Sequence, residues 1–290
     1  MTVTETEPSY PVSDTAALVM LWARGYYETM PLVGTYLTML DLSRGRQLLE
    51  HYNRICPWYP EVIINRKHFI KNMVEELVGT DGKRTLIVNL GAGFSPLALE
   101  LSPQLCDRIR FIEIDRSNMS DKHRLYSRLV PDRCRFISSL ESDIADTASL
   151  VDCLRKEMGD PLATRLIVVM EGLSYYIERS AMEQVLSSLS GLAPDLGIVF
   201  EHLKPCRLIN DERRFIPYRI FSHVRDYTHL NRMTTYTEDE LRTLMGPAFS
   251  CSYYDMDQME MRRTGSNRYF PAPGDGWLSC AVAVRRPGTE

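Results

Sequence analysis

Residues 85–96, with the sequence TLIVNLGAGFSP, decide the fold of this chain. The apolar run at their start, which contains β-branched Ile87 and Val88, is typical of a strand buried on both faces. The Gly-Ala-Gly segment 91–93 then lets the backbone turn tightly and approach a ligand with no Cβ in the way. Ser95 suits a helix N-cap, and Pro96 suits the first helical position. The free N–H groups at such a helix start would favour a phosphate or a carboxylate.

Composition narrows the possible classes of protein. A chain of 290 residues with 44% hydrophobic content can bury a large core, and we expect one catalytic domain with extra elements. The net charge of −4 and the spread of Lys and Arg along the chain argue against a nucleic-acid partner. The sequence leaves the oligomeric state undefined.

Targeting, metal and disulfide patterns are missing from the sequence. No apolar run approaches the roughly 20 residues of a membrane span, and residues 1–11 are polar and acidic, unlike a signal peptide. We therefore expect a soluble, cytoplasmic protein with no membrane partner. The seven cysteines include no C-x-x-C pair, so neither a zinc site nor a disulfide framework is predicted.

The order of predicted elements indicates an α/β fold. Residues 1–79 have a helical pattern and form the predicted N-terminal helical cap, with a helix starting at Ser13 or Asp14. Residues 80–290 form the predicted catalytic domain, in which strands and helices alternate as in an open, mostly parallel sheet. Strands are expected at 86–90, 109–114, 134–138, 165–170 and 197–202, and helices near 96–102, 118–129, 147–158 and 180–191.

Two features are predicted for the last third of the chain. Residues 203–235 break the alternation and form an expected insertion that covers the site together with the N-terminal helices. Thr237 and Glu240 then have the spacing of a capping box at a helix start. Two closing strands, near 249–256 and 277–285, are expected to form an antiparallel hairpin with no helix between them.

Acidic residues at strand ends indicate the kind of ligand. A dinucleotide fingerprint requires a third glycine where this chain has Pro96, so a fold that binds S-adenosylmethionine is favoured over one that binds a dinucleotide. Asp115 ends the second strand, where one carboxylate can accept from both hydroxyls of a ribose; alternatively it caps the next helix. Glu171 and Gly172 follow the fourth strand, and a carboxylate there could hold an α-amino group but would repel a pyrophosphate.

Several motifs in order resemble the leucine carboxyl methyltransferase family, which includes eukaryotic enzymes that esterify a protein C-terminus and bacterial O-methyltransferases associated with polyketides. The resemblance covers about residues 13–202. It rests on SDTAAL at 13–18, Arg66, VNLGAG at 88–93, EID at 113–115 and EGLSYY at 171–176.

The resemblance implies a class I methyltransferase fold, Rossmann-like, with S-adenosylmethionine across the carboxyl ends of the strands. Arg66 would pair with the methionine carboxylate, although a solvated helix charge is the alternative from the residue alone. The other implied cofactor contacts are Gly91, Ala92 and Gly93 to the methionine part, Asp115 to the ribose, Asp143 and Ile144 to the adenine, and Glu171 and Gly172 beside the methionine.

The chain also departs from the family pattern. It has Ser95-Pro96-Leu97 where the family commonly has Asp-Thr-Arg, and Arg116-Ser117 in place of Leu-Pro. The Asp143 match needs inserted residues after Phe136. These departures suggest a divergent bacterial member and leave the substrate open.

The predicted activity is S-adenosylmethionine-dependent O-methylation of a carboxylate or hydroxyl of a small molecule, such as a natural product. His202, which follows Glu201 at the end of the fifth strand, is the candidate base for a hydroxyl. Tyr27, Tyr176 and His223 are candidate substrate contacts, and no metal is required. A nicotinamide-dependent oxidoreductase and a non-catalytic S-adenosylmethionine-binding protein are the alternatives.

Overall fold

A seven-stranded sheet organises the computed structural model, which describes residues 10–228 and 231–286. The strand order is β5-β4-β3-β6-β7-β9-β8; the first five strands run parallel, and β9 is antiparallel to both β7 and β8. The predicted mostly parallel sheet with a terminal antiparallel pair is confirmed. The bounds are β3 Arg84–Leu90, β4 Ile109–Asp115, β5 Ile137–Glu141, β6 Thr164–Met170, β7 Leu196–Leu203, β8 Phe249–Tyr254 and β9 Leu278–Arg285.

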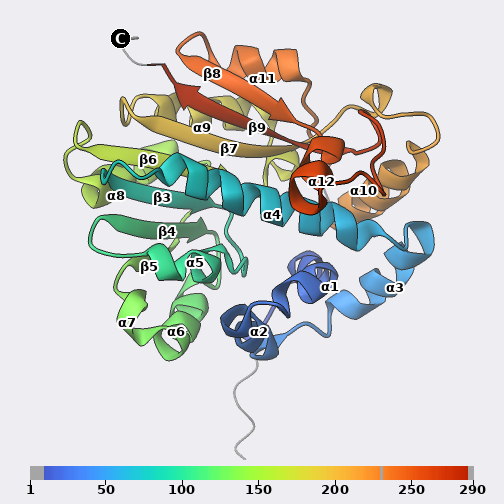
Figure 1. Ribbon diagram of the computed structural model, residues 1–290, viewed down its shortest axis with the longest axis horizontal. Helices are drawn as coiled ribbons and strands as arrows, with labels where there is room; N and C mark the ends of the chain where they lie inside the picture. The colour runs from blue at the N-terminus through green and yellow to red at the C-terminus, as the bar shows by residue number, and fades with distance from the viewer. Residues whose placement is uncertain (1–9, 229–230, 287–290) are drawn as a thin grey trace, which may run out of the picture.

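Helices cover both faces of the sheet (Figure 1). Alternate residues of a strand point to opposite faces, and in β3 Ile87 joins one apolar core while Leu86 and Val88 join the other. The first core contains α4 (Tyr59–Val78), α5 (Leu97–Glu100), α6 (Met119–Leu129) and α7 (Pro131–Cys134). The second contains α8 (Thr147–Met158), α9 (Arg179–Ser190) and α11 (Glu238–Met245).

The N-terminal helices share a core with the sheet. They are α1 (Asp14–Tyr27), α2 (Pro31–Thr38), α3 (Gly45–Ile55) and α4, with a short parallel pair β1 (Tyr10–Pro11) and β2 (Leu40–Asp41) beside them. Ala17 of α1, Ile70 of α4 and Val169 of β6 belong to the same apolar cluster. The division into a cap and a catalytic domain at residue 79 remains a prediction.

The switch in strand order places the site. From β3 the chain builds outward through β4 and β5, and then returns to the other side of β3 for β6. In open α/β sheets the crevice outside the carboxyl ends of the strands at such a reversal is the usual ligand site. In Figure 1 α1, α3 and α10 (Phe215–Tyr227) lie toward the same end of the sheet.

The helix after the glycine turn differs from the prediction. Ser95 N donates to the Ala92 carbonyl (2.9 Å), so the chain makes one further turn, and α5 begins at Leu97 with Pro96 as its N-cap. Within residues 10–228 and 231–286, the Ser95 hydroxyl has no hydrogen-bond partner. The predicted Ser95 cap is therefore wrong, and a helix of four residues carries too small a dipole to define an anion site.

Two further boundaries differ. Pro131 starts the short helix α7, so β5 begins at Ile137 rather than at the predicted residue 134. Helix α12 (Met256–Thr264) lies between β8 and β9, where none was predicted; a capping box of Asp255 and Gln258 starts it. The predicted capping box of Thr237 and Glu240 is confirmed at the start of α11.

The remaining short elements are η1 (Ser102–Gln104), η2 (Ser174–Tyr176) and η3 (Cys206–Leu208). Among residues 10–228 and 231–286, no helix combines the length and the apolar character that crossing a bilayer requires.

Candidate functional site

Two adjoining clefts open at the carboxyl ends of β3, β4 and β6. The α4 cleft, of about 240 Å³, is lined by Arg66 and Lys67 of α4 and by Glu171 after β6. The β5 cleft, of about 310 Å³, is lined by Ile144 and its neighbours after β5. Gly91, Asp115 and Tyr176 line both clefts, so the two form one elongated site.

The glycine turn forms the floor between the clefts. Gly91 has φ +67°, and a Cβ there would lie 2.6 Å from Leu173 Cδ1, so the turn requires glycine for both conformation and space. The N–H groups of Gly91 and Ala92 both donate to the Ile114 carbonyl (2.9 and 3.1 Å), and Gly93, with φ +43°, donates its N–H to Asp115 Oδ2 (2.8 Å). The turn is therefore held against the end of β4.

Asp115 faces the site and does not cap the following helix. Its Oδ1 accepts from the Arg116 N–H (2.7 Å), and each oxygen keeps capacity for a further donor. Helix α6 has Asn118 as its N-cap, and the N–H of Met119 is bound by Glu141 Oε1 (3.1 Å). The capping alternative for Asp115 is thus wrong.

Four buried charges lie behind the α4 cleft. Arg66 binds Glu171 through Nη2 (2.9 Å) and Glu201 through Nη1 (3.2 Å), and Lys67 Nζ binds Glu171 Oε1 (2.8 Å). Arg66 is only 2% exposed, so the alternative of a solvated helix charge is wrong. Arg66 Nε is buried and has no partner within the described residues, which leaves a donor for a further group.

Lys67 and Arg66 affect the pKa values of Glu171 and Glu201 to different extents. Burial alone would raise the pKa of Glu171, but the charges of Lys67 and Arg66 outweigh burial and lower that pKa to about 2. Burial raises the pKa of Glu201, and Arg66 opposes this effect only in part. Glu171 is therefore the firmly ionised acid at the cleft, with both cations beside it.

The β5 cleft has an apolar wall. Ile144, Leu173 and Ile177 line it. The Asp143 carboxylate does not line it: it accepts from the Ala145 N–H (2.9 Å) and pairs with Arg116 Nη2 (3.0 Å). Of the two predicted adenine contacts, the structure thus brings only Ile144 to the cleft.

Tyr176, but not Tyr27, reaches the site. Tyr176 lines both clefts, and burial raises its pKa to about 12. Tyr27 is fully buried, donates its hydroxyl to Glu100 Oε1 (3.3 Å) and lines neither cleft.

The structure leaves both candidate histidines outside the clefts. His202 is 1% exposed, and its backbone neighbour Glu201 points to Arg66, so the His202 side chain lies on the opposite face of the sheet. Burial lowers the pKa of His202 to about 4. His223, on α10, shares a hydrogen bond of 2.7 Å between its Nδ1 and the Tyr52 hydroxyl on α3.

Sequence reasoning missed Lys67. It expected the N-terminal helices to cover the site but did not name the residues of α1 that line it. Ile63, Arg66, Lys67 and Ile70 follow the spacing of one helix face, so this periodicity could have indicated that Lys67 is buried beside Arg66. The α1 segment that lines the cleft consists of Ser13, Thr15, Ala16, Val19 and Met20.

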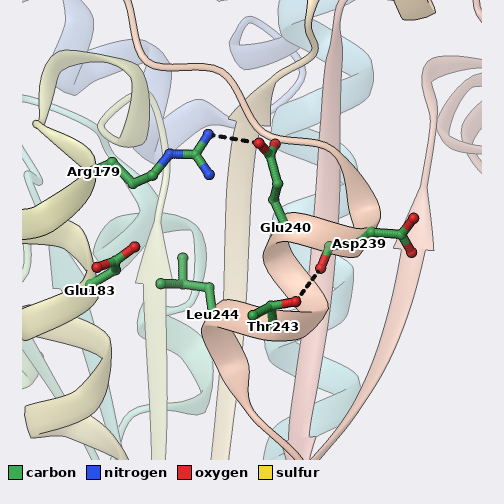
Figure 2. Close-up of a pocket in the computed structure, with 6 residues that line it drawn as sticks. All are labelled: Arg179, Glu183, Asp239, Glu240, Thr243 and Leu244. Carbon is green, nitrogen blue, oxygen red and sulfur yellow. Dashed lines mark hydrogen bonds and ion pairs between the residues drawn. The ribbon is translucent and has the colours of Figure 1, made fainter.

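A larger hollow of about 480 Å³ lies between α9 and α11 (Figure 2). Several of its polar groups bind one another: Arg179 Nη2 pairs with Glu240 Oε1 (3.2 Å), and the Thr243 hydroxyl donates to the Asp239 carbonyl (2.9 Å). It shares no lining residue with the two clefts, and we assign it no role.

The elongated site fits S-adenosylmethionine. The α4 cleft offers cations and the ionised Glu171 to a zwitterionic amino-acid end, and Arg66 Nε has no partner in the described part of the chain. Asp115 at the junction suits a ribose diol, and the apolar wall of the β5 cleft suits a flat base. The chemical groups thus follow the order of the cofactor.

Comparison with known proteins agrees with this geometry. The leucine carboxyl methyltransferase family matches residues 7–190, and no curated protein sequence matches the chain. A crystal structure of a candidate methyltransferase from Thermobifida fusca is similar with a TM-score of 0.66, 13% identity and 97% of both chains covered. A DUF574 family protein from Streptomyces avermitilis is similar with a TM-score of 0.63 and 14% identity, over 84% of this chain and 91% of that one.

These structural similarities establish the fold, and the sequence match establishes the family. The nicotinamide-dependent alternative is therefore wrong. The chain belongs to the leucine carboxyl methyltransferase family and is an S-adenosylmethionine-dependent methyltransferase.

Proposed function

We propose that this protein methylates an oxygen atom of a small molecule, with a carboxylate favoured over a hydroxyl. One observation carries this proposal: the described residues that line the two clefts include no histidine, and Glu171, the carboxylate nearest the buried cations, is held ionised by them. A carboxylate is already a nucleophile at neutral pH, whereas a hydroxyl usually benefits from a base.

The cofactor supplies an electrophilic methyl group, which bonds to the acceptor oxygen as the carbon–sulfur bond breaks and sulfur keeps the electron pair. The chain's own residues would hold the cofactor in place: Arg66 and Lys67 at its carboxylate, Glu171 at its amino group, and Asp115 at its ribose. Gly91 and Gly93 would let the backbone approach it closely, and Ile144 would pack on its base. We do not assign Asp143 or His202 a role in this arrangement.

Tyr176 is the proposed contact to the acceptor oxygen. Because burial raises its pKa to about 12, Tyr176 keeps its proton at neutral pH and acts as a donor rather than as a base. A donor of this kind can orient a carboxylate, which has no proton that a base would need to remove. Orientation alone can remove ~7–11 kcal/mol of a barrier when the reacting atoms are aligned.

The N-terminal helices and the insertion exclude water from this space. Helix α1 lines the α4 cleft directly. Phe221 of α10 packs edge-on against Tyr175, with 5.6 Å between the ring centroids, and Tyr175 lines the same cleft. The proposed lid is therefore made of α1 on one side and α10 on the other.

The test is an acceptor screen scored by S-adenosylhomocysteine release, with matched carboxylic acids, alcohols and amines. We expect release with carboxylic acids and formation of methyl esters by mass spectrometry. Tyr176→Phe should lower turnover about tenfold or more, since one buried hydrogen bond to a charged group is worth about 1.5–3 kcal/mol. Tyr227→Phe, at an exposed position on α10, is the matched control.

Methylation of amines with none of carboxylic acids or alcohols would refute O-methylation. If only alcohols were methylated, the proposed preference for carboxylates would be wrong. The base that activates the hydroxyl would then be a residue other than those that line the two clefts.

A further inference from the structure

A separate cavity of about 260 Å³ lies under α10, between that helix and the end of β7. We call it the α10 cavity. Its apolar walls come from β7, the segment after it, α10 and the chain before α11: Leu203, Ile209, Pro217, Phe221 and Met233. Walls of this kind accept an aliphatic or aromatic body.

Three cations line this cavity, and acids outside its lining pair with two of them. Lys204, Arg225 and Arg232 line it, and none of the described lining residues is acidic. Lys204 pairs with Asp255 (2.5 Å), and Arg225 pairs with the exposed Asp226 (2.7 Å). The exposed Arg232 forms no hydrogen bond or ion pair with any residue in the described ranges. A cavity lined by charges of one sign attracts a ligand of the opposite charge.

One aromatic layer separates this cavity from the proposed methyl-transfer site. Phe221 lines the α10 cavity and Tyr175 lines the α4 cleft, and their rings are in edge-to-face contact at 5.6 Å. The Thr234 N–H donates to the Tyr175 carbonyl (3.1 Å), which fixes the cavity wall to the cleft wall. The inner end of the cavity therefore lies next to the site, and the arginines lie at its outer end.

We propose that the α10 cavity binds the methyl acceptor, and that this acceptor is an apolar molecule with an anionic group distant from the methylated oxygen. The anion lies at Arg225 and Arg232, and the apolar body lies along Phe221. The methylated oxygen enters the α4 cleft past Tyr175, so the ring contact between Phe221 and Tyr175 opens when the acceptor binds. This inference rests on the proposed O-methyltransferase function and adds a class of substrate to it.

Two dyes of similar shape test the inference on the full-length protein. 1-Anilinonaphthalene-8-sulfonate carries an anion, and N-phenyl-1-naphthylamine is its neutral analogue; both fluoresce when an apolar site takes them up. We expect Arg225→Gln/Arg232→Gln to weaken sulfonate binding about tenfold, as two partly exposed ion pairs together would. The neutral dye should change by less than about twofold, because no charge interaction is lost.

Two matched variants identify the binding site. Arg44→Gln/Arg46→Gln removes the same charge from an exposed surface at the start of α3 and should leave both affinities unchanged. Ser222→Trp fills the cavity from α10 and should abolish binding of both dyes and turnover in the acceptor screen. It should not change the rise in melting temperature with S-adenosylhomocysteine, because Ser222 lies outside both cofactor clefts.

If the Arg225 and Arg232 replacements left the affinity for the sulfonate dye unchanged, or weakened both dyes equally, the proposal that the acceptor carries an anionic group would be wrong. Dye binding and turnover that survive Ser222→Trp would overturn the cavity as the acceptor site. If S-adenosylhomocysteine failed to stabilise the wild-type protein, the proposed function would fail instead, and the dye results would still decide the cavity.

Discussion

Asp115 is the residue with most influence on the cofactor site, because it lines both clefts and holds the N–H of Gly93 at 2.8 Å. Asp115→Ala should weaken S-adenosylhomocysteine binding roughly ten- to a hundredfold, since hydrogen bonds to a charged group are worth about 1.5–3 kcal/mol. Isothermal titration calorimetry measures this change, with the exposed Asp107→Ala as control. Unchanged affinity would remove Asp115 from the site.

Glu100 should make stability depend on pH near neutrality. Burial raises its pKa from 4.5 to about 7, and its Oε2 is buried without a partner among the residues that the structure describes. The folded state therefore binds this proton more tightly than the unfolded state. The resulting stability is fully present below about pH 4.5 and is lost as pH rises through 7, by up to about 3 kcal/mol.

Urea denaturation at pH 5 and pH 8 measures this effect. The free energy of unfolding of the wild type should fall between these values relative to Glu100→Gln, which cannot ionise. The exposed Glu50→Gln should follow the wild type. A parallel pH dependence for wild type and Glu100→Gln would show that Glu100 does not titrate in this range.

At the level of single residues, position along the chain predicted which side chains meet at the sheet edge but not which way they point. Gly91, Asp115 and Glu171 each follow a strand, and the parallel sheet brings such residues together. Glu201 and His202 both end β7, but successive side chains face opposite sides, and Glu201 is the one that binds Arg66. The prediction named His202 as the candidate base and gave Glu201 no role, but Glu201 is the residue whose side chain faces the site.

Among the elements, the contact between α1 and α3 depends on a glycine. A Cβ on Gly45 would lie 2.6 Å from the Leu18 nitrogen in the backbone of α1. Gly45→Ala should therefore push α1 away, destabilise the protein by ~1–3 kcal/mol as overpacking does, and weaken S-adenosylhomocysteine binding because α1 lines the α4 cleft.

Gly25, on the exposed side of α1, provides the control, because no other described part of the chain outside its own helical turn lies within 4 Å of a Cβ at this position. Gly25→Ala should stabilise the protein by about 0.4–1 kcal/mol, because alanine reduces the conformational freedom of the unfolded chain. Thermal denaturation with and without S-adenosylhomocysteine measures both variants. If Gly45→Ala bound the ligand as well as Gly25→Ala, the position of α1 would not matter for the cofactor.

Element prediction succeeded where the hydrophobic pattern was long and failed where the element was short. The buried strands β3, β6 and β7 have clear apolar runs, and β4 is rich in isoleucine and phenylalanine. Helix α12 has an apolar face of only a few residues, so its capping box of Asp255 and Gln258 was the only strong indication in the sequence. Helix α7 spans four residues, and periodicity cannot detect a single turn.

Across the whole molecule, the three tryptophans connect the ends of the chain. The Trp58 ring lies 5.9 Å from that of Trp277, and Tyr59 lies between Trp22 (4.2 Å) and Trp277 (5.5 Å). Trp277 directly precedes β9, so the N-terminal helices pack against the start of the last strand in the chain. The sequence could not predict this contact, because more than 200 residues separate its partners.

This packing predicts that the N-terminal helices and the sheet unfold together, even though the sequence suggested a cap separate from a catalytic domain. One apolar cluster contains Ala17, Ile70 and Val169, so loss of either part would expose the core of the other. Tryptophan fluorescence, which reports on the junction, and far-UV circular dichroism, which reports on the whole chain, should give coincident urea transitions. A fluorescence transition at clearly lower urea than the loss of helix signal would show instead that residues 1–79 come apart first, as an independent cap.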